Sequence, residues 1–98
     1  MDDEVRAALS ELRSRIAAER ALIADLAANL TQQPMRDFLR QATNHVDDAG
    51  GILIGVEKST TPWILIGGSR TFLGLATQHR QRVEKYRSTY GPDVTLVG

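Results

Sequence analysis

Residues 63–80 read WILIGGSRTFLGLATQHR, an apolar run that passes through two glycines into a segment with helical spacing. A similar apolar run, ILIGVE, occupies residues 52–57 and is separated from the first by KSTTP. Short apolar runs rich in β-branched residues predict strands, so these two runs predict a β-hairpin. Both runs are apolar at nearly every position, which indicates that both faces of the sheet are covered.

The segment after the glycines predicts a helix that ends at Gly91 and Pro92, because glycine caps a helix and proline stops it. Its apolar side chains recur on one helical face, at Phe72, Leu75, Ala76, His79, Val83, Tyr86 and Tyr90. The closing segment DVTLVG, residues 93–98, predicts a third strand. If it joins the strand at 63–67, the two strands and the helix between them form a right-handed crossover.

The first thirty residues predict one long amphipathic helix of about 25 residues. Its seam residues are spaced alternately by four and three, as in a coiled coil with one charged position. They are Val5, Leu9, Leu12, Ile16, Glu19, Ile23, Leu26 and Leu30. Pro34 then suits the first turn of a second helix at residues 34–48, which Gly50 and Gly51 are expected to end.

These elements predict an α+β fold with the order α-α-β-β-α-β and a small mixed three-stranded sheet. The length of 98 residues indicates a single domain. Within it, we expect residues 1–31 to form an oligomerisation or partner-binding helix. Residues 32–98 are expected to form a compact α/β body.

The composition is that of an ordinary globular protein, with 42% apolar residues and no cysteine. Without cysteine there are no disulfides and no thiol chemistry, which fits a reducing, cytoplasmic location. The N-terminus is acidic, the wrong sign for a targeting peptide. The net charge is zero, but residues 1–49 carry −3 and residues 50–98 carry +3. A neutral chain is a poor general ligand for nucleic acid, whereas its charge asymmetry suits head-to-tail contacts between copies.

The heptad seam is the main candidate interface. At about 40 Å the first helix exceeds the diameter of a compact chain of this size, which is roughly 25–30 Å. We therefore expect part of the seam to protrude and to bind a second copy or a partner helix. Glu19 is expected to set the register of this contact or to pair with an arginine.

The two glycines raise a second candidate, an anion site at a helix N-terminus. Its residues would be Gly67, Gly68, Ser69, Arg70 and Thr71. Their spacing matches neither the phosphate-loop nor the dinucleotide-binding pattern. The alternative is a simple turn from strand to helix, capped by Ser69 or Thr71.

Other polar groups give weaker signals. The segment HRQRVEKYR, residues 79–87, is basic and suits either an acidic partner or a solvated helix end. His45 is followed by Asp47 and Asp48, but neighbours along a helix do not share a face, so we predict no metal site. We also expect no catalytic residues and no cofactor, because no catalytic or cofactor-binding spacing is present.

Residues 23–56 resemble a winged helix-turn-helix, in which the second helix enters the major groove and a hairpin forms the wing. The resemblance implies that residues 34–48 read DNA through Arg36, Arg40, Gln41 and Asn44. Asp37 and Asp47 lie on the same helix and would repel phosphate.

The sequence therefore predicts a non-catalytic self-assembling or protein-interaction module, of the kind used as a subunit in multi-copy assemblies. Its contacts are expected through the heptad helix and through an edge strand at residues 93–98. A DNA-binding winged helix-turn-helix regulator is the alternative. No membrane partner is expected, because no stretch reaches about 18 apolar residues.

Overall fold

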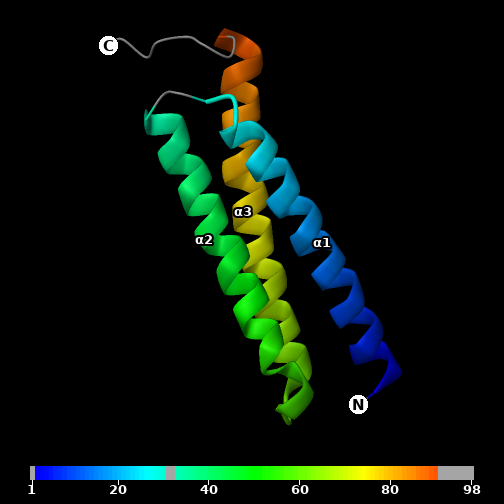
Figure 1. Cartoon of the computed structure of the whole chain (residues 1–98). Helices are drawn as coiled ribbons and strands as arrows, with labels where there is room; N and C mark the ends of the chain where they lie inside the picture. The colour runs from blue at the N-terminus through cyan, green and yellow to red at the C-terminus, as the bar shows by residue number, and fades with distance from the viewer. Residues whose placement is uncertain (1, 31–32, 91–98) are drawn as a thin grey trace.

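The chain folds into an antiparallel bundle of three α-helices, shown in Figure 1. The computed structural model describes residues 2–30 and 33–90. Helix α1 spans Asp3–Ala27, α2 spans Gln33–Ile54 and α3 spans Pro62–Tyr90. A short 3-10 turn, η1, covers Val56–Lys58 between α2 and α3. The extents are 52 × 18 × 17 Å, so the bundle is much longer than it is wide.

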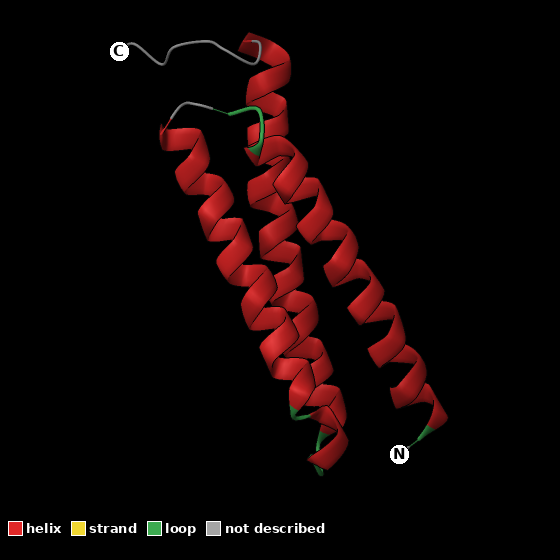
Figure 2. Cartoon of the chain, viewed as in Figure 1, coloured by secondary structure: helices red, strands yellow, loops and turns green. Residues whose placement is uncertain are grey.

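The predicted α+β fold is wrong, because Figure 2 shows helices and loops but no strand in the described part of the chain. Residues 52–57 cover the end of α2 and the start of η1, and residues 63–67 lie in the first turns of α3. The α/β body predicted for residues 32–98 therefore consists of helices and turns over residues 33–90. The third predicted strand, at residues 93–98, lies outside the described residues.

Helical packing, rather than local sequence preference, determines the secondary structure of residues 52–57 and 63–67. An apolar run without gaps fits a buried helix as well as a buried strand. Here the buried positions continue through the predicted stop at Gly50 and Gly51 with alternating steps of four and three. They are Ala42, Val46, Ala49, Leu53 and Val56. A helical glycine costs about 1 kcal/mol relative to alanine, which is less than the roughly 1.5–3 kcal/mol gained by burying one large apolar side chain. Helix α2 therefore continues to Ile54 instead of ending near residue 48.

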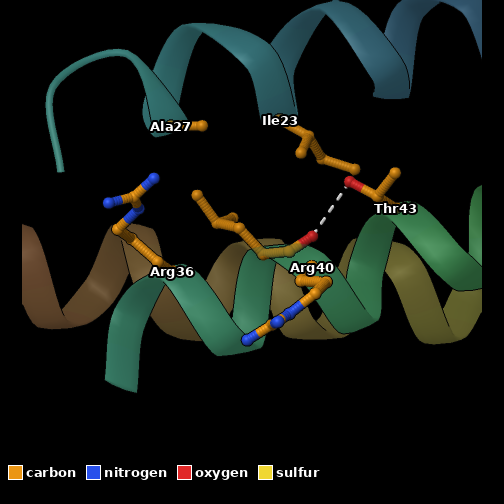
Figure 3. Close-up of a pocket in the computed structure, with 6 residues that line it drawn as sticks. Ile23, Ala27, Arg36, Arg40 and Thr43 are labelled. Carbon is orange, nitrogen blue, oxygen red and sulfur yellow. Dashed lines mark hydrogen bonds between the residues drawn. The ribbon is translucent and has the colours of Figure 1, made fainter. Parts of the chain in front are cut away.

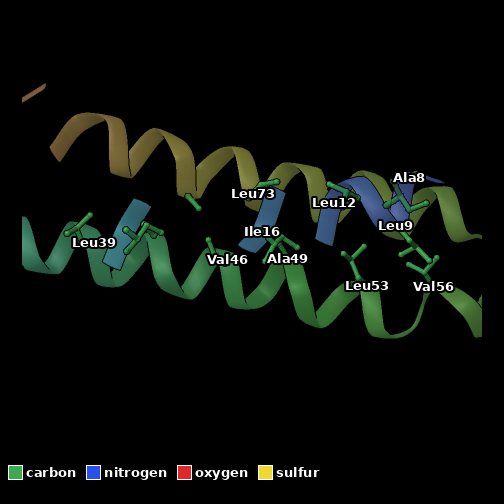
Figure 4. Close-up of a cluster of buried hydrophobic side chains, with 14 of the residues drawn as sticks. Ala8, Leu9, Leu12, Ile16, Leu39, Val46, Ala49, Leu53, Val56 and Leu73 are labelled. Carbon is green, nitrogen blue, oxygen red and sulfur yellow. The ribbon is translucent and has the colours of Figure 1, made fainter. Parts of the chain in front are cut away.

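All three helices contribute a seam to one hydrophobic core, part of which is shown in Figure 4. Each seam alternates steps of four and three, as in a coiled-coil bundle. On α1 the buried seam runs through Val5, Leu9, Leu12, Ile16, Glu19 and Ile23. On α2 it runs through Met35, Leu39, Ala42, Val46, Ala49 and Leu53. On α3 it runs through Ile66, Ser69, Leu73, Ala76, Arg80 and Val83.

Helices α2 and α3 are the most closely packed pair. Small seam residues allow this approach, notably Ala42 and Ala49 on α2 and Ala76 on α3, all of which are fully buried. The hydroxyl of Ser69, also fully buried, donates a hydrogen bond of 2.9 Å to the carbonyl oxygen of Ala49. This bond satisfies a polar group inside the core and joins the two helices.

Helix α1 has the 25 residues that its sequence predicts. The Asp2 carboxylate accepts a hydrogen bond of 3.2 Å from the Glu4 backbone N–H and caps its first turn. The expectation that the helix would protrude assumed a roughly spherical domain. A helix of this length spans about 38 Å, and the elongated bundle, 52 Å long, accommodates it alongside α2 and α3.

Candidate interaction surfaces

The predicted interface seam of α1 lies inside the chain's own bundle. Seven of its eight residues are buried, and the eighth, Leu26, is partly buried against the core. The partners of this seam are α2 and α3 of the same chain, so the heptad pattern is accounted for without a second copy. The seam is therefore not an exposed docking surface in this structure.

Glu19 pairs with an arginine, Arg80 of α3, and both side chains are largely buried between α1 and α3. The Thr77 hydroxyl donates a hydrogen bond of 2.6 Å to the other carboxylate oxygen of Glu19. Arg80 also lies 2.6 Å from the Glu84 carboxylate, one turn along α3. The hydrogen bond to Glu19 raises the pKa of Arg80, against the opposing effect of burial. Arg80 belongs to the basic segment at 79–87, so one cation of that predicted surface is used inside the core.

The predicted anion site lies in the interior of α3. Helix α3 begins at Pro62, so Gly67 and Gly68 do not form a turn from strand to helix, and that prediction is wrong. The side chain of Ser69 is buried against α2, and the Thr71 hydroxyl donates a hydrogen bond of 3.0 Å to the Gly67 carbonyl oxygen. Arg70 is exposed. Backbone N–H groups in a helix interior are engaged in the helical ladder, so they cannot form the expected cradle.

The four residues of the DNA-reading interpretation, Arg36, Arg40, Gln41 and Asn44, are exposed on α2. The prediction of a β-hairpin as the wing is wrong, since residues 52–57 form the end of α2, a turn at Gly55 and the start of η1. Arg40 forms an ion pair with Asp37 on its own helix.

Two of these arginines line a hollow of about 280 Å³ between α1 and α2, shown in Figure 3. Its other lining residues are Ile23, Ala27, Leu39 and Thr43. The hydrogen bond drawn in the figure, from the Thr43 hydroxyl to the Leu39 carbonyl oxygen, is internal to α2. The hollow lies at the lower limit of ordinary small-molecule pockets, which enclose roughly 300–1,000 Å³.

A column of four rings lies between α2 and α3. It runs in the order Phe38, His79, His45 and Phe72, with centroid distances of 6.2, 5.2 and 6.0 Å. We call these four residues the ring column. On each helix its members are seven residues apart, so they lie on one side of that helix.

The ring column lies in the α2–α3 crease that α1 does not cover. Helix α1 meets α2 beside Leu39 and Thr43 and meets α3 beside Leu73 and Thr77. None of these positions belongs to the column. The column is therefore partly open to solvent, and Phe38 is one of the exposed large apolar residues.

The most exposed large apolar side chains in the described chain gather at the end where α2 turns into α3. Ile54 is 81% exposed, Ile64 is 71% exposed and Trp63 is 46% exposed. We call these three residues the apolar tip. Ile54 ends α2, and Trp63 and Ile64 follow Pro62 in the first turn of α3. The α2–α3 turn lies at the end of the bundle opposite the end where α1 finishes and α2 begins, as Figure 1 shows.

Sequence reasoning placed the tip residues in buried strands and so missed their exposure. The helical seam gives the correct signal, because Leu53 and Ile66 occupy seam positions while their neighbours do not. The ring column was missed for a different reason: its residues lie in two predicted helices, and the sequence does not show that these helices pack side by side. Its signal is the seven-residue spacing of Phe38 with His45 and of Phe72 with His79.

Comparison with protein-family models, with curated proteins and with solved structures gave no match. Over residues 2–30 and 33–90, no helix is both long enough and apolar enough to cross a membrane.

Proposed function

We propose that the protein is a non-catalytic interaction module that associates with a second copy through its apolar tip. The exposure of Ile54, Trp63 and Ile64 is the observation that supports this proposal. Burying one such side chain stabilises a complex by about 1.5–3 kcal/mol. Exposed apolar clusters on a folded protein mark interaction sites more often than isolated exposed residues do.

The apolar tip is proposed as the contact surface instead of the two surfaces expected from the sequence, the heptad seam and the edge strand. The heptad seam is filled by the chain's own helices, and the edge strand predicted at residues 93–98 lies outside the described residues. A second copy is the occupant we favour, because an isologous contact needs only one self-complementary apolar patch. The proposal keeps the cytoplasmic location expected for a cysteine-free chain.

Sedimentation equilibrium over a range of protein concentrations tests the proposal. We expect a mass above that of the 10.8 kDa chain, rising with concentration. Serine substitutions at all three tip residues should return the mass to that of the monomer while circular dichroism shows the same helix content.

The matched control is Leu22→Ser, which removes an exposed leucine from α1, far from the α2–α3 turn. This variant should associate as the wild type does. A wild-type protein that stays monomeric at its highest soluble concentration would exclude self-association. Equal loss of association in the control and in the tip variant would exclude the tip as the contact.

A further inference from the structure

The two histidines of the chain face each other inside the ring column. The imidazole planes of His45 and His79 differ by 4°, and their centroids are 5.2 Å apart. Phe72 flanks His45 and Phe38 flanks His79, so apolar rings close both ends of the pair. This pair joins the middle of α2 to the middle of α3.

Neither ring has a hydrogen-bond acceptor beside its Nδ1 atom. The Nδ1 atoms of His45 and His79 are buried and have no hydrogen-bond partner. A neutral imidazole can leave one nitrogen without a proton, whereas an imidazolium carries N–H donors on both nitrogens. Protonation would therefore create a buried donor without an acceptor, which is costly.

The surrounding charges add to this effect. Arg82, one turn from His79 on α3, contributes a positive charge. On α2, the exposed Asp48 stands one turn from His45, where water screens its charge. Helix α1 packs on the other side of the α2–α3 pair, and its Glu19 is held by Arg80. Burial first, then His45 and Arg82, lower the pKa of His79 below the ordinary value of 6.5.

The geometry does not suit a shared metal ion. The lone pair that binds a metal lies in the plane of the imidazole ring. In two nearly parallel, stacked rings these lone pairs run side by side and do not converge on one point. The described residues also contain no cluster of three or more metal-ligating side chains.

We propose that the His45–His79 pair is an acid-sensitive latch, which holds α2 against α3 while the rings are neutral and weakens when they are protonated. Two protonated rings would place two positive charges about 5 Å apart in a partly buried crease. The latch is a contact within one chain, so it does not depend on self-association through the apolar tip.

The direction of the pH effect follows from proton linkage. The folded-state pKa of His79 lies below its unfolded value of 6.5, so the unfolded chain binds more protons. The neutral His79 ring therefore contributes fully to stability above pH 6.5, and this contribution is lost as the pH falls through and below that value. The unfolding equilibrium constant should rise by up to about tenfold for each pH unit over which the unfolded His79 is protonated and the folded one is not.

Urea denaturation at about pH 7.5, 6.5 and 5.5 tests the latch, since ordinary carboxylates titrate near pH 4 and the pair contains both histidines of the chain. The wild type should lose stability between the two lower values. The His45→Phe/His79→Phe variant keeps a stack of four rings and should show no such loss. The matched control is Gln78→His, which adds an exposed histidine next to His79 in the sequence and should leave the wild-type pH dependence unchanged.

A wild-type unfolding constant that is equal at the upper and lower pH values would overturn the proposal. Retention of the full pH dependence in the double variant would do the same. If the double variant does not fold, an NMR titration of the wild-type imidazoles decides the matter. The proposal requires the His79 ring to titrate below 6.5 in the folded protein, and a midpoint at or above that value refutes it.

Discussion

Replacing Arg80 by methionine tests whether the core of the bundle depends on its ion pair. The side chains of Glu19 and Arg80 are only 5% and 11% exposed. In Arg80→Met, Glu19 stays buried and keeps the hydrogen bond from Thr77 but loses its counter-ion. Leaving one charge of a buried pair without its partner costs about 3–5 kcal/mol. We expect the free energy of unfolding, measured by urea denaturation with circular dichroism, to fall by that amount.

The matched control is Arg20→Met, which breaks the ion pair between Arg20 and Asp47. This pair joins α1 to α2 at 2.6 Å, but its side chains are 48% and 55% exposed. Exposed pairs contribute about 0–1 kcal/mol, because water already stabilises both charges. Both substitutions replace an arginine by methionine, so the difference between their losses in free energy of unfolding reports the effect of burial.

The double variant Glu19→Leu/Arg80→Met removes both charges and fills their places with apolar side chains. Its stability should equal or exceed that of the wild type, since apolar replacements of buried pairs are neutral or stabilising by about 1–4 kcal/mol. If Arg80→Met is too unstable to fold, Glu19→Gln keeps the shape and an acceptor and should cost about 1.5–3 kcal/mol. The reasoning fails if Arg80→Met costs no more than Arg20→Met. It also fails if the double variant is as unstable as the single one, because lost packing would then be the cause.

Two further predictions concern the glycines and DNA. Gly50→Ala and Gly67→Ala should each stabilise the protein by about 0.5–1 kcal/mol in urea denaturation. A Cβ at either position meets no atom within 4 Å, and a loss of stability would contradict a helical backbone there. We also expect no salt-dependent binding to duplex DNA in fluorescence anisotropy at low salt, because Arg40 is already paired with Asp37. Binding that weakens with salt and in Arg36→Ala/Arg40→Ala would favour the DNA-binding alternative.

The sequence predicts the first half of this fold better than the second. In α1, polar residues and alanines separate the large seam side chains, so a helical period fits the pattern, and the predicted length is correct. Residues 52–57 and 63–67 lack that contrast, since nearly every position is apolar. The prediction therefore followed the local preference of β-branched residues for strands. The helical seam that overrides this preference begins further upstream, at Met35. Propensity is a weak signal when tertiary packing covers a whole helix face.

The partners of the polar core groups were only partly predictable. A charged residue in a heptad seam suggests a buried counter-ion, and Glu19 meets this expectation with Arg80. The sequence does not predict that Arg80 is the arginine that pairs with Glu19, because the pairing depends on the axial register between α1 and α3. His45 and His79 pose the same difficulty, since their stacking follows from the antiparallel pairing of α2 with α3. His45 and His79 are 34 positions apart, so they come into contact only after both helices and the turn between them have formed.

The residues that hold the fold and those that form the proposed contact are largely separate. Trp63 and Ile64 precede the first seam residue of α3, Ile66, and Ile54 follows the last seam residue of α2, Leu53. Serine at Ile54 and Ile64 should therefore leave the core unchanged, because these two side chains bury little area within one chain. Trp63 is only 46% exposed, so serine at that position also removes some packing within the chain. Stability and association can then vary independently. If the tip variants lost both together, the tip would have a structural role within the chain, and its exposure would no longer support the proposed contact.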